Sequence, residues 1–181
     1  MDGQILIFIQ EWMRSDFLTP VMMTITRLGD SGFIWIAISM VLLLFQKTRK
    51  AGWISFFSIA FCFLINNLIL KNAVARPRPY ETVEGLELLA ARARDFSFPS
   101  GHACSSFAAA CSYHRVLPRK AGIAAIILAA LISFSRLYVG IHYPTDVLCG
   151  ALIGIFGSLL VFRVWRRIEK MRAMMKKRRK K

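Results

Sequence analysis

The sequence predicts an all-α integral membrane protein, a polytopic helical bundle of about five to six helices that includes an N-terminal interfacial helix. Hydrophobic residues make up 56% of the 181 positions, and the mean hydropathy is +0.49. These values are too apolar for an ordinary soluble domain. Because no Ser-, Gly- or Pro-rich linker divides the chain, residues 1–181 are expected to form one domain. Within it we expect an N-terminal segment (1–30), a transmembrane core (31–165) and a basic tail (166–181).

The first element is an amphipathic helix over residues 2–17. Its apolar side chains recur at helical spacing, at Ile5, Leu6, Ile9, Trp12 and Met13. Charged residues occupy the rest of the helical wheel, a pattern typical of a helix that lies in the membrane interface. The N-terminus has no basic start for a signal peptide, so we expect it to be retained. The next stretch is too interrupted to span alone, and Asp30 or Ser31 is expected to cap the helix that follows.

Five apolar segments follow, and each is predicted to be a helix of the bundle. They are residues 33–45, 53–70, 99–113, 121–134 and 144–165. The first reaches the ~20 residues of a membrane span only if it extends into 29–32. Asn66 and Asn67 are expected to face other helices rather than lipid, and the third segment, rich in Ala, Ser and Cys, suits the bundle interior. Close helix contacts are expected at Gly150, Gly154 and Gly157.

The distribution of charge predicts the orientation in the membrane. Residues 46–50, 114–120 and the tail from Arg163 hold 17 of the 25 Lys and Arg residues but only one acidic residue. This asymmetry predicts that these segments are cytoplasmic. Residues 71–98 and 135–145 would then lie outside, together with the N-terminal helix. The tail is expected to bind anionic lipid headgroups; a nucleic-acid-binding arm is the alternative, and no nucleic acid is expected.

Neither a metal nor a cofactor is expected. The four cysteines lie in apolar stretches without a paired CxxC spacing, which favours small buried side chains over a disulfide or a zinc site. Three glutamates, Glu81, Glu84 and Glu87, repeat at i, i+3 and are expected to form an exposed helix face rather than a cation site.

Three groups of polar residues interrupt the apolar pattern, and all fall on the predicted outer side. The first is Lys71 with Arg78, and the second is the PSGH segment at 99–102. The third is 135–146, which contains Arg136, Gly140, His142 and Asp146. Ionisable residues beside membrane segments are costly to hold in place and point to a functional site.

These groups have the chemistry of a phosphate site. Lys71, Arg78 and Arg136 provide three cations, and arginine forks onto phosphate oxygens. Ser100 and Gly101 are expected at a helix N-terminus, where free backbone N–H groups bind anions. Pro144 at a first helical position would place Asp146 in the first turn, just after His142, so that the carboxylate accepts from one imidazole nitrogen and leaves the other free to attack.

Each group taken alone has a purely structural alternative. The RPRP segment is typical of a turn, and Arg136 and Asp146 together are compatible with an ion pair inside the bundle. Arg76, Arg92 and Arg94 are expected to be solvated or paired with nearby glutamates, with contact to a second phosphate as the alternative. His114 lies in a basic turn, and we assign it no role.

In order and spacing, the three groups resemble the K-x6-RP, PSGH and SR-x5-H-x3-D signature of the type-2 phosphatidic acid phosphatase superfamily. They correspond to residues 71–79, 99–102 and 135–146. This superfamily also includes vanadium haloperoxidases and bacterial undecaprenyl-diphosphate phosphatases. The resemblance covers roughly the second half of the chain, and every signature position matches.

The resemblance implies a metal-independent phosphatase. His142 would attack phosphorus to give a phosphohistidine, Asp146 would orient its ring, and His102 would protonate the leaving oxygen and then activate water. The phosphate oxygens would be held by Lys71, Arg78, Arg136 and the amides near Ser100 and Gly101.

The implied substrate is a lipid phosphate or diphosphate held at the outer surface of the cell membrane. Undecaprenyl diphosphate is favoured by analogy. Phosphatidic acid or phosphatidylglycerol phosphate is the alternative within the same class. A membrane protein that binds or transports lipid headgroups without catalysis is the alternative from another class, but it would have no use for two histidines.

Overall fold

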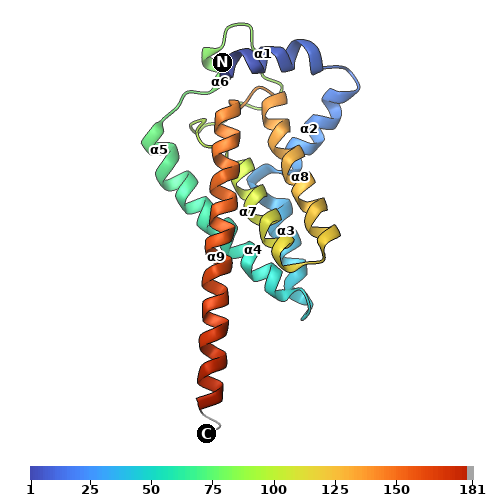
Figure 1. The fold of residues 1–181 in the computed structure, drawn as a ribbon. Helices are drawn as coiled ribbons and strands as arrows, with labels where there is room; N and C mark the ends of the chain where they lie inside the picture. The colour runs from blue at the N-terminus through green and yellow to red at the C-terminus, as the bar shows by residue number, and fades with distance from the viewer. Residues whose placement is uncertain (179–181) are drawn as a thin grey trace.

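The computed structural model describes residues 1–178, and this part of the chain contains helices and no strands. Figure 1 shows the arrangement. The helices are α1 (Asp2–Met13), α2 (Leu18–Leu28), η1 (Asp30–Gly32), α3 (Phe33–Leu44), α4 (Arg49–Phe63), η2 (Leu64–Leu70), α5 (Lys71–Val74), α6 (Pro79–Thr82), α7 (Gly101–Val116), α8 (Arg119–Tyr138) and α9 (Pro144–Arg178). The predicted all-α helical bundle is confirmed, and residues 179–181 of the predicted basic tail lie outside the described residues.

The N-terminal helix α1 lies across one end of the bundle (Figure 1). Leu6 and Ile9 are buried, whereas Phe8 and Trp12 are exposed and stack on each other. One face of α1 is therefore buried and the other is exposed, in agreement with the apolar spacing in the sequence. Helix α2 then turns into the bundle and packs against α8, so the segment across the end stops at Met13 rather than at residue 30.

Helices α2 and α3 form one bent unit, with an angle of 46° between them. Ser31 and Gly32 have φ angles of +53° and +66° in the break, a left-handed conformation that ends one helix and restarts the next. The predicted cap at Asp30 or Ser31 is wrong, because Gly32 precedes α3 and no side chain caps that helix. The carboxylate of Asp30 contacts His102 instead.

Three helical stretches are long and apolar enough to cross a membrane, and the bent α2–α3 pair makes a fourth if it is counted as one span. They are residues Arg49–Thr82, Arg119–Tyr138 and Pro144–Arg178. Helix α7, with 16 residues, extends about 24 Å and lies in the centre of the bundle (Figure 1). The chain is therefore a multi-pass membrane protein with one short internal helix.

Polar residues of α7 explain its central position. Ser106 accepts a hydrogen bond from the Trp35 indole at 2.8 Å, and Ser112 donates to Ser58 at 3.2 Å. These contacts satisfy hydroxyl groups that would be costly in lipid. Asn66 is also buried and donates to the carbonyl of Pro99, which confirms that it faces the protein.

Helix α9 packs closely against α7 because glycines leave room for the neighbouring backbone. A Cβ atom at Gly150 would come within 2.5 Å of the Ser100 carbonyl oxygen, and one at Gly154 would clash with the carbonyl oxygen of Cys104. Gly157 similarly lies against Cys62. The predicted close contacts at these glycines are confirmed. Beyond the bundle α9 continues to Arg178, so residues 166–178 of the predicted separate tail are part of this helix.

Replacing Gly154 with valine is expected to destabilise the protein, because the new side chain overlaps the α7 backbone. Overpacking of this kind typically costs about 1–3 kcal/mol, so the melting temperature in detergent should fall. Leu152→Val is the matched control, since Leu152 lies on the same helix but is exposed. Equal melting temperatures for the two variants would contradict the tight α7–α9 contact.

The two ends of the bundle differ in charge. The α3–α4 and α7–α8 connections lie at the end from which α9 emerges, and the Lys50–Glu169 ion pair of 2.7 Å joins two of these basic segments. The opposite end carries α1, the 75–100 connection and the turn between α8 and α9 (Figure 1). In that connection the predicted exposed glutamate helix is wrong, because α6 ends at Thr82 and residues Glu84 and Glu87 lie in a turn and a coil.

Candidate active site

The turn between α8 and α9 presents His142 at the end of the bundle that carries α1. Gly140 has a φ angle of +78°, and a Cβ there would come within 3.0 Å of the Glu87 carbonyl oxygen. Glycine is therefore required both for the left-handed backbone and for the close approach. Four residues after Gly140, α9 begins at Pro144, and its first turn contains Asp146, as predicted.

His142 is buried and surrounded by groups that fix its ring. Its Nδ1 atom lies 3.5 Å from Asp146 Oδ2 and 3.4 Å from Ser97 Oγ. Its Nε2 atom lies 3.5 Å from a guanidinium nitrogen of Arg78. The carboxylate and the serine thus occupy the Nδ1 side of the ring, whereas Nε2 is directed toward a cation that was predicted to bind phosphate.

The environment keeps the imidazole of His142 neutral at neutral pH. Burial lowers the pKa of His142 to about 3, and the charge of Arg78 acts in the same direction, while the hydrogen bond with Asp146 partly offsets them. Desolvation disfavours the charged ring. A neutral imidazole retains a lone pair, which a nucleophile needs.

Asp146 is held by several donors besides His142. Arg76 donates to its Oδ1 atom at 2.6 Å, Ser97 donates to Oδ2, and the Tyr143 amide donates to Oδ2 at 3.0 Å. Arg76 also pairs with Asp2 of α1 at 2.9 Å. Arg76 is therefore paired with two aspartates, rather than solvated or paired with a nearby glutamate, and α1 is tied to the first turn of α9.

Two of the three predicted phosphate-binding cations, Lys71 and Arg78, lie together. Both are buried, and both pair with the carboxylate of Asp95. Arg78 is also held by main-chain oxygens: it donates to the carbonyls of Asp95 and Ile141 at 2.9 Å each, and to that of Phe96 at 3.3 Å. Its position therefore does not depend on the carboxylate alone.

His102 lies at the start of α7 and has a carboxylate partner that the sequence analysis missed. Its Nε2 atom is 3.0 Å from Asp30 Oδ1, and Arg136 lies 4.0 Å from the same oxygen. Arg136 also donates to the Thr26 hydroxyl at 2.6 Å. Arg136 and Asp146 thus have other partners, so the alternative of an ion pair between these two residues is not what the structure shows.

The N-terminus of α7 is formed by Ser100 and Gly101, as predicted. Ser100 precedes the helix, its hydroxyl accepts from the Ala103 amide at 3.4 Å, and its own amide donates to the Asp146 carbonyl at 3.0 Å. The amide of Ser100 is therefore already bound. Gly101 and His102, the first two residues of the helix, have no acceptor within the helix for their N–H groups.

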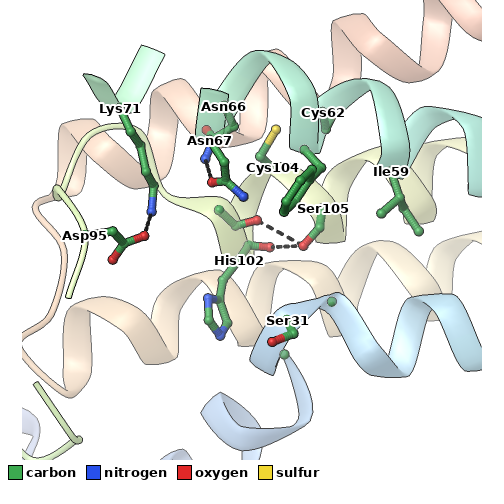
Figure 2. Close-up of a pocket in the computed structure, with 14 residues that line it drawn as sticks. Ser31, Ile59, Cys62, Asn66, Asn67, Lys71, Asp95, His102, Cys104 and Ser105 are labelled. Atoms are coloured by element: carbon green, nitrogen blue, oxygen red, sulfur yellow. Dashed lines mark hydrogen bonds and ion pairs between the residues drawn. The ribbon is translucent and has the colours of Figure 1, made fainter. Parts of the chain in front are cut away.

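A cavity of about 270 Å³ joins the first two motifs. Figure 2 shows Lys71 and Asp95 at one end, the amides of Asn66 and Asn67 in the middle, and Ile59 at the other end. His102, Gly101 and Gly29 also line it. The cavity therefore changes from charged to apolar along α4 and the π-helical turn of η2, which suits a ligand with an ionic group on an apolar chain.

The three motifs converge through pairwise contacts. Arg78 of the first motif contacts His142 of the third, Lys71 and His102 share the cavity, and His102 meets Arg136 through Asp30. Ser97, Asp95 and Asp30 lie outside the signature, which is why the sequence analysis missed them. One signal was present: Asp30 is an acidic residue at the start of an apolar segment, although it was interpreted as a cap. Among residues 1–178, no group of three or more His, Cys, Asp or Glu side chains is placed to hold a metal.

Comparison with known families gives one match over most of the described bundle. The profile of the PAP2 superfamily matches residues 51–170. This range contains all three motifs, whereas Asp30 and α1 lie before it.

Individual proteins are similar over 81–92% of the chain. An undecaprenyl-diphosphatase from Sulfolobus acidocaldarius is 33% identical over 147 residues, covering 81% of this chain and 70% of that protein. Phosphatidylglycerophosphatase B from Bacillus subtilis is 32% identical over 165 residues, covering 82% and 76%. The crystal structure of a transmembrane PAP2-type phosphatidylglycerolphosphate phosphatase from Bacillus subtilis superposes with a TM-score of 0.74 at 29% identity, covering 92% and 85%.

Proposed function

This chain belongs to the PAP2 superfamily, and from that premise we propose that it removes the terminal phosphate from a membrane lipid through a phosphohistidine on His142. It is a multi-pass membrane phosphatase, and its relatives act on lipid phosphates. The observation that carries the proposal is the contact of 3.5 Å between His142 Nε2 and Arg78, because it places a neutral nucleophile beside a cation suited to phosphate oxygens.

In the first step, the Nε2 lone pair of His142 attacks phosphorus and the bond to the leaving oxygen breaks. Asp146 accepts a hydrogen bond from the Nδ1–H group of His142 and stabilises the positive charge that develops on the ring. His102 donates a proton to the leaving oxygen. Burial lowers the pKa of His102, and the hydrogen bond with the Asp30 carboxylate offsets part of this shift, so Asp30 favours the protonated form that this role needs.

In the second step, His102 takes a proton from water, which attacks the phosphohistidine. The P–N bond then breaks, and inorganic phosphate and neutral His142 are released. Lys71, Arg78 and Arg136, with the amides of Gly101 and His102, provide the positive groups that would stabilise the equatorial oxygens in both steps. This scheme needs no metal, because side chains supply both the charge and the proton transfers.

For the substrate we favour undecaprenyl diphosphate. The similarity to an undecaprenyl-diphosphatase supports this choice, as does the polar-to-apolar cavity, which suits a phosphate on a long chain. Phosphatidylglycerol phosphate is the second candidate, supported by the similarity to a phosphatidylglycerophosphatase in both sequence and fold.

The proposed site faces the extracytoplasmic side of the membrane, and the C-terminal helix extends into the cytoplasm. The support is the segregation of charge, since the basic α3–α4 and α7–α8 connections and the end of α9 all lie opposite the end of the bundle that carries α1 and the turn between α8 and α9 (Figure 1). Basic segments are retained in the cytoplasm, and there the tail of α9 would meet anionic headgroups.

A substrate panel tests the proposal. Undecaprenyl diphosphate, phosphatidate and phosphatidylglycerol phosphate are presented in matched micelles, and released phosphate is measured with and without EDTA. We expect the highest kcat/KM for undecaprenyl diphosphate and no loss in EDTA. A higher kcat/KM for phosphatidylglycerol phosphate would make that lipid the preferred substrate in place of undecaprenyl diphosphate. Inactivation by EDTA would rule out the metal-free mechanism.

A further inference from the structure

The carboxylate of Asp95 contacts two of the cations that are proposed to bind phosphate. Its Oδ1 atom lies 2.6 Å from Nη2 of Arg78, and its Oδ2 atom pairs with the amine of Lys71. The two cations are only 4% and 8% exposed at their side chains, whereas that of Asp95 is 53% exposed. Two buried cations are thus paired with the carboxylate of one half-exposed side chain.

A carboxylate and a phosphate compete for the same contacts. Both present oxygens that accept from a guanidinium fork and from an ammonium group. Partial burial raises the pKa of Asp95, but the hydrogen bond and charge of Lys71 and the charge of Arg78 outweigh it and hold that pKa below the usual range of a carboxyl. Asp95 is therefore an anion at neutral pH and competes as one.

Building on the proposed function, we propose that Asp95 is an internal competitor for the phosphate site. It pairs with Lys71 and Arg78 when the site is empty, gives them up when the substrate phosphate enters, and returns to them as inorganic phosphate leaves. Asp95 and the phosphate therefore do not contact the two cations at the same time. The residue thereby weakens the binding of substrate and product phosphate by the same factor and prevents the product from remaining on the enzyme.

The surroundings allow this exchange. Arg78 keeps its contacts to the carbonyl oxygens of Asp95, Ile141 and Phe96 when the carboxylate leaves, so the guanidinium remains in place for the incoming phosphate. Asp95 lies in the connection between α6 and α7 and lines the cavity. Its half-exposed side chain can rotate toward solvent without opening the core.

The neutral variant Asp95→Asn tests the proposal in the full-length protein in detergent. Binding of inorganic phosphate is measured by titration calorimetry, and its competitive inhibition constant is measured against a soluble aryl phosphate. We expect Asp95→Asn to bind phosphate about 10-fold more tightly, the size expected for two partly exposed ion pairs that no longer have to be broken. Glu84→Gln is the control, because it removes the same charge from an exposed position in the same connection, and its affinity should match that of the parent.

Two other results have distinct meanings. If Asp95→Asn binds phosphate equally or more weakly while the parent binds it, Asp95 is not a competitor, and the inference fails even though the phosphate site stands. The variant Lys71→Met tests the proposed phosphate site separately from the role of Asp95. It should weaken phosphate binding in the Asp95→Asn background, and unchanged binding there would mean that the two cations do not form the phosphate site.

Discussion

Replacement of His142 with alanine is expected to lower kcat for a lipid phosphate by at least about 10⁴-fold, the scale of loss when a covalent nucleophile is removed. The ring is buried and held between Asp146, Ser97 and Arg78, so its removal takes away the proposed nucleophile. Rapid acid-free quenching with labelled substrate should trap a base-stable phosphoenzyme in the parent and none in His142→Ala.

A matched histidine provides the control for this experiment. His114 lies near the opposite end of α7 and is exposed, so His114→Ala should keep the activity and the trapped intermediate. Activity of His142→Ala close to that of the parent would show that another residue attacks phosphorus. The contacts of His142 would then serve only to stabilise the fold.

Substitution of Asp30 by asparagine is expected to reduce kcat by about 10²-fold for an alkyl lipid phosphate, the lower range for general acid catalysis. The carboxylate lies 3.0 Å from His102 Nε2, and its negative charge favours the protonated ring that donates to the leaving oxygen. The loss should be only a few-fold for 4-nitrophenyl phosphate, because nitrophenolate departs without a proton.

The difference between the two substrates distinguishes a role in proton transfer from a role in folding. His102→Gln should show the same pattern, since it removes the proton donor itself. Asp16→Asn is the control, because Asp16 is an exposed acid outside the bundle core. Equal losses on both substrates for Asp30→Asn would mean that Asp30 serves only to hold the α2–α3 break against α7.

The parts of the site that could be predicted are those set by local sequence. Pro144 at a helix start determines that Asp146 lies in the first turn, and the i, i+4 spacing then brings it to His142. Gly140 likewise marks a backbone that only glycine adopts easily. The grouping of the three motifs rested on resemblance to a family, whose signature encodes contacts that the single sequence does not reveal.

The parts that were missed depend on contacts between distant segments. Asp30 precedes His102 by 72 residues, and Asp95 and Ser97 lie in a connection with no periodic pattern. For the fold, apolar stretches predicted the bundle correctly, but they could not show that α2 and α3 form one bent unit. That bend depends on two left-handed residues, Ser31 and Gly32, whose conformation no hydropathy pattern records.

The tie from Asp2 through Arg76 to Asp146 also bears on how the bundle folds. Asp2 and Asp146 are far apart in the sequence, and the guanidinium of Arg76 contacts both carboxylates. Helix α1 can therefore form these ion pairs only when the first turn of α9 lies beside Arg76. Contacts of such long sequence separation form slowly, so the docking of α1 depends on the prior approach of distant segments.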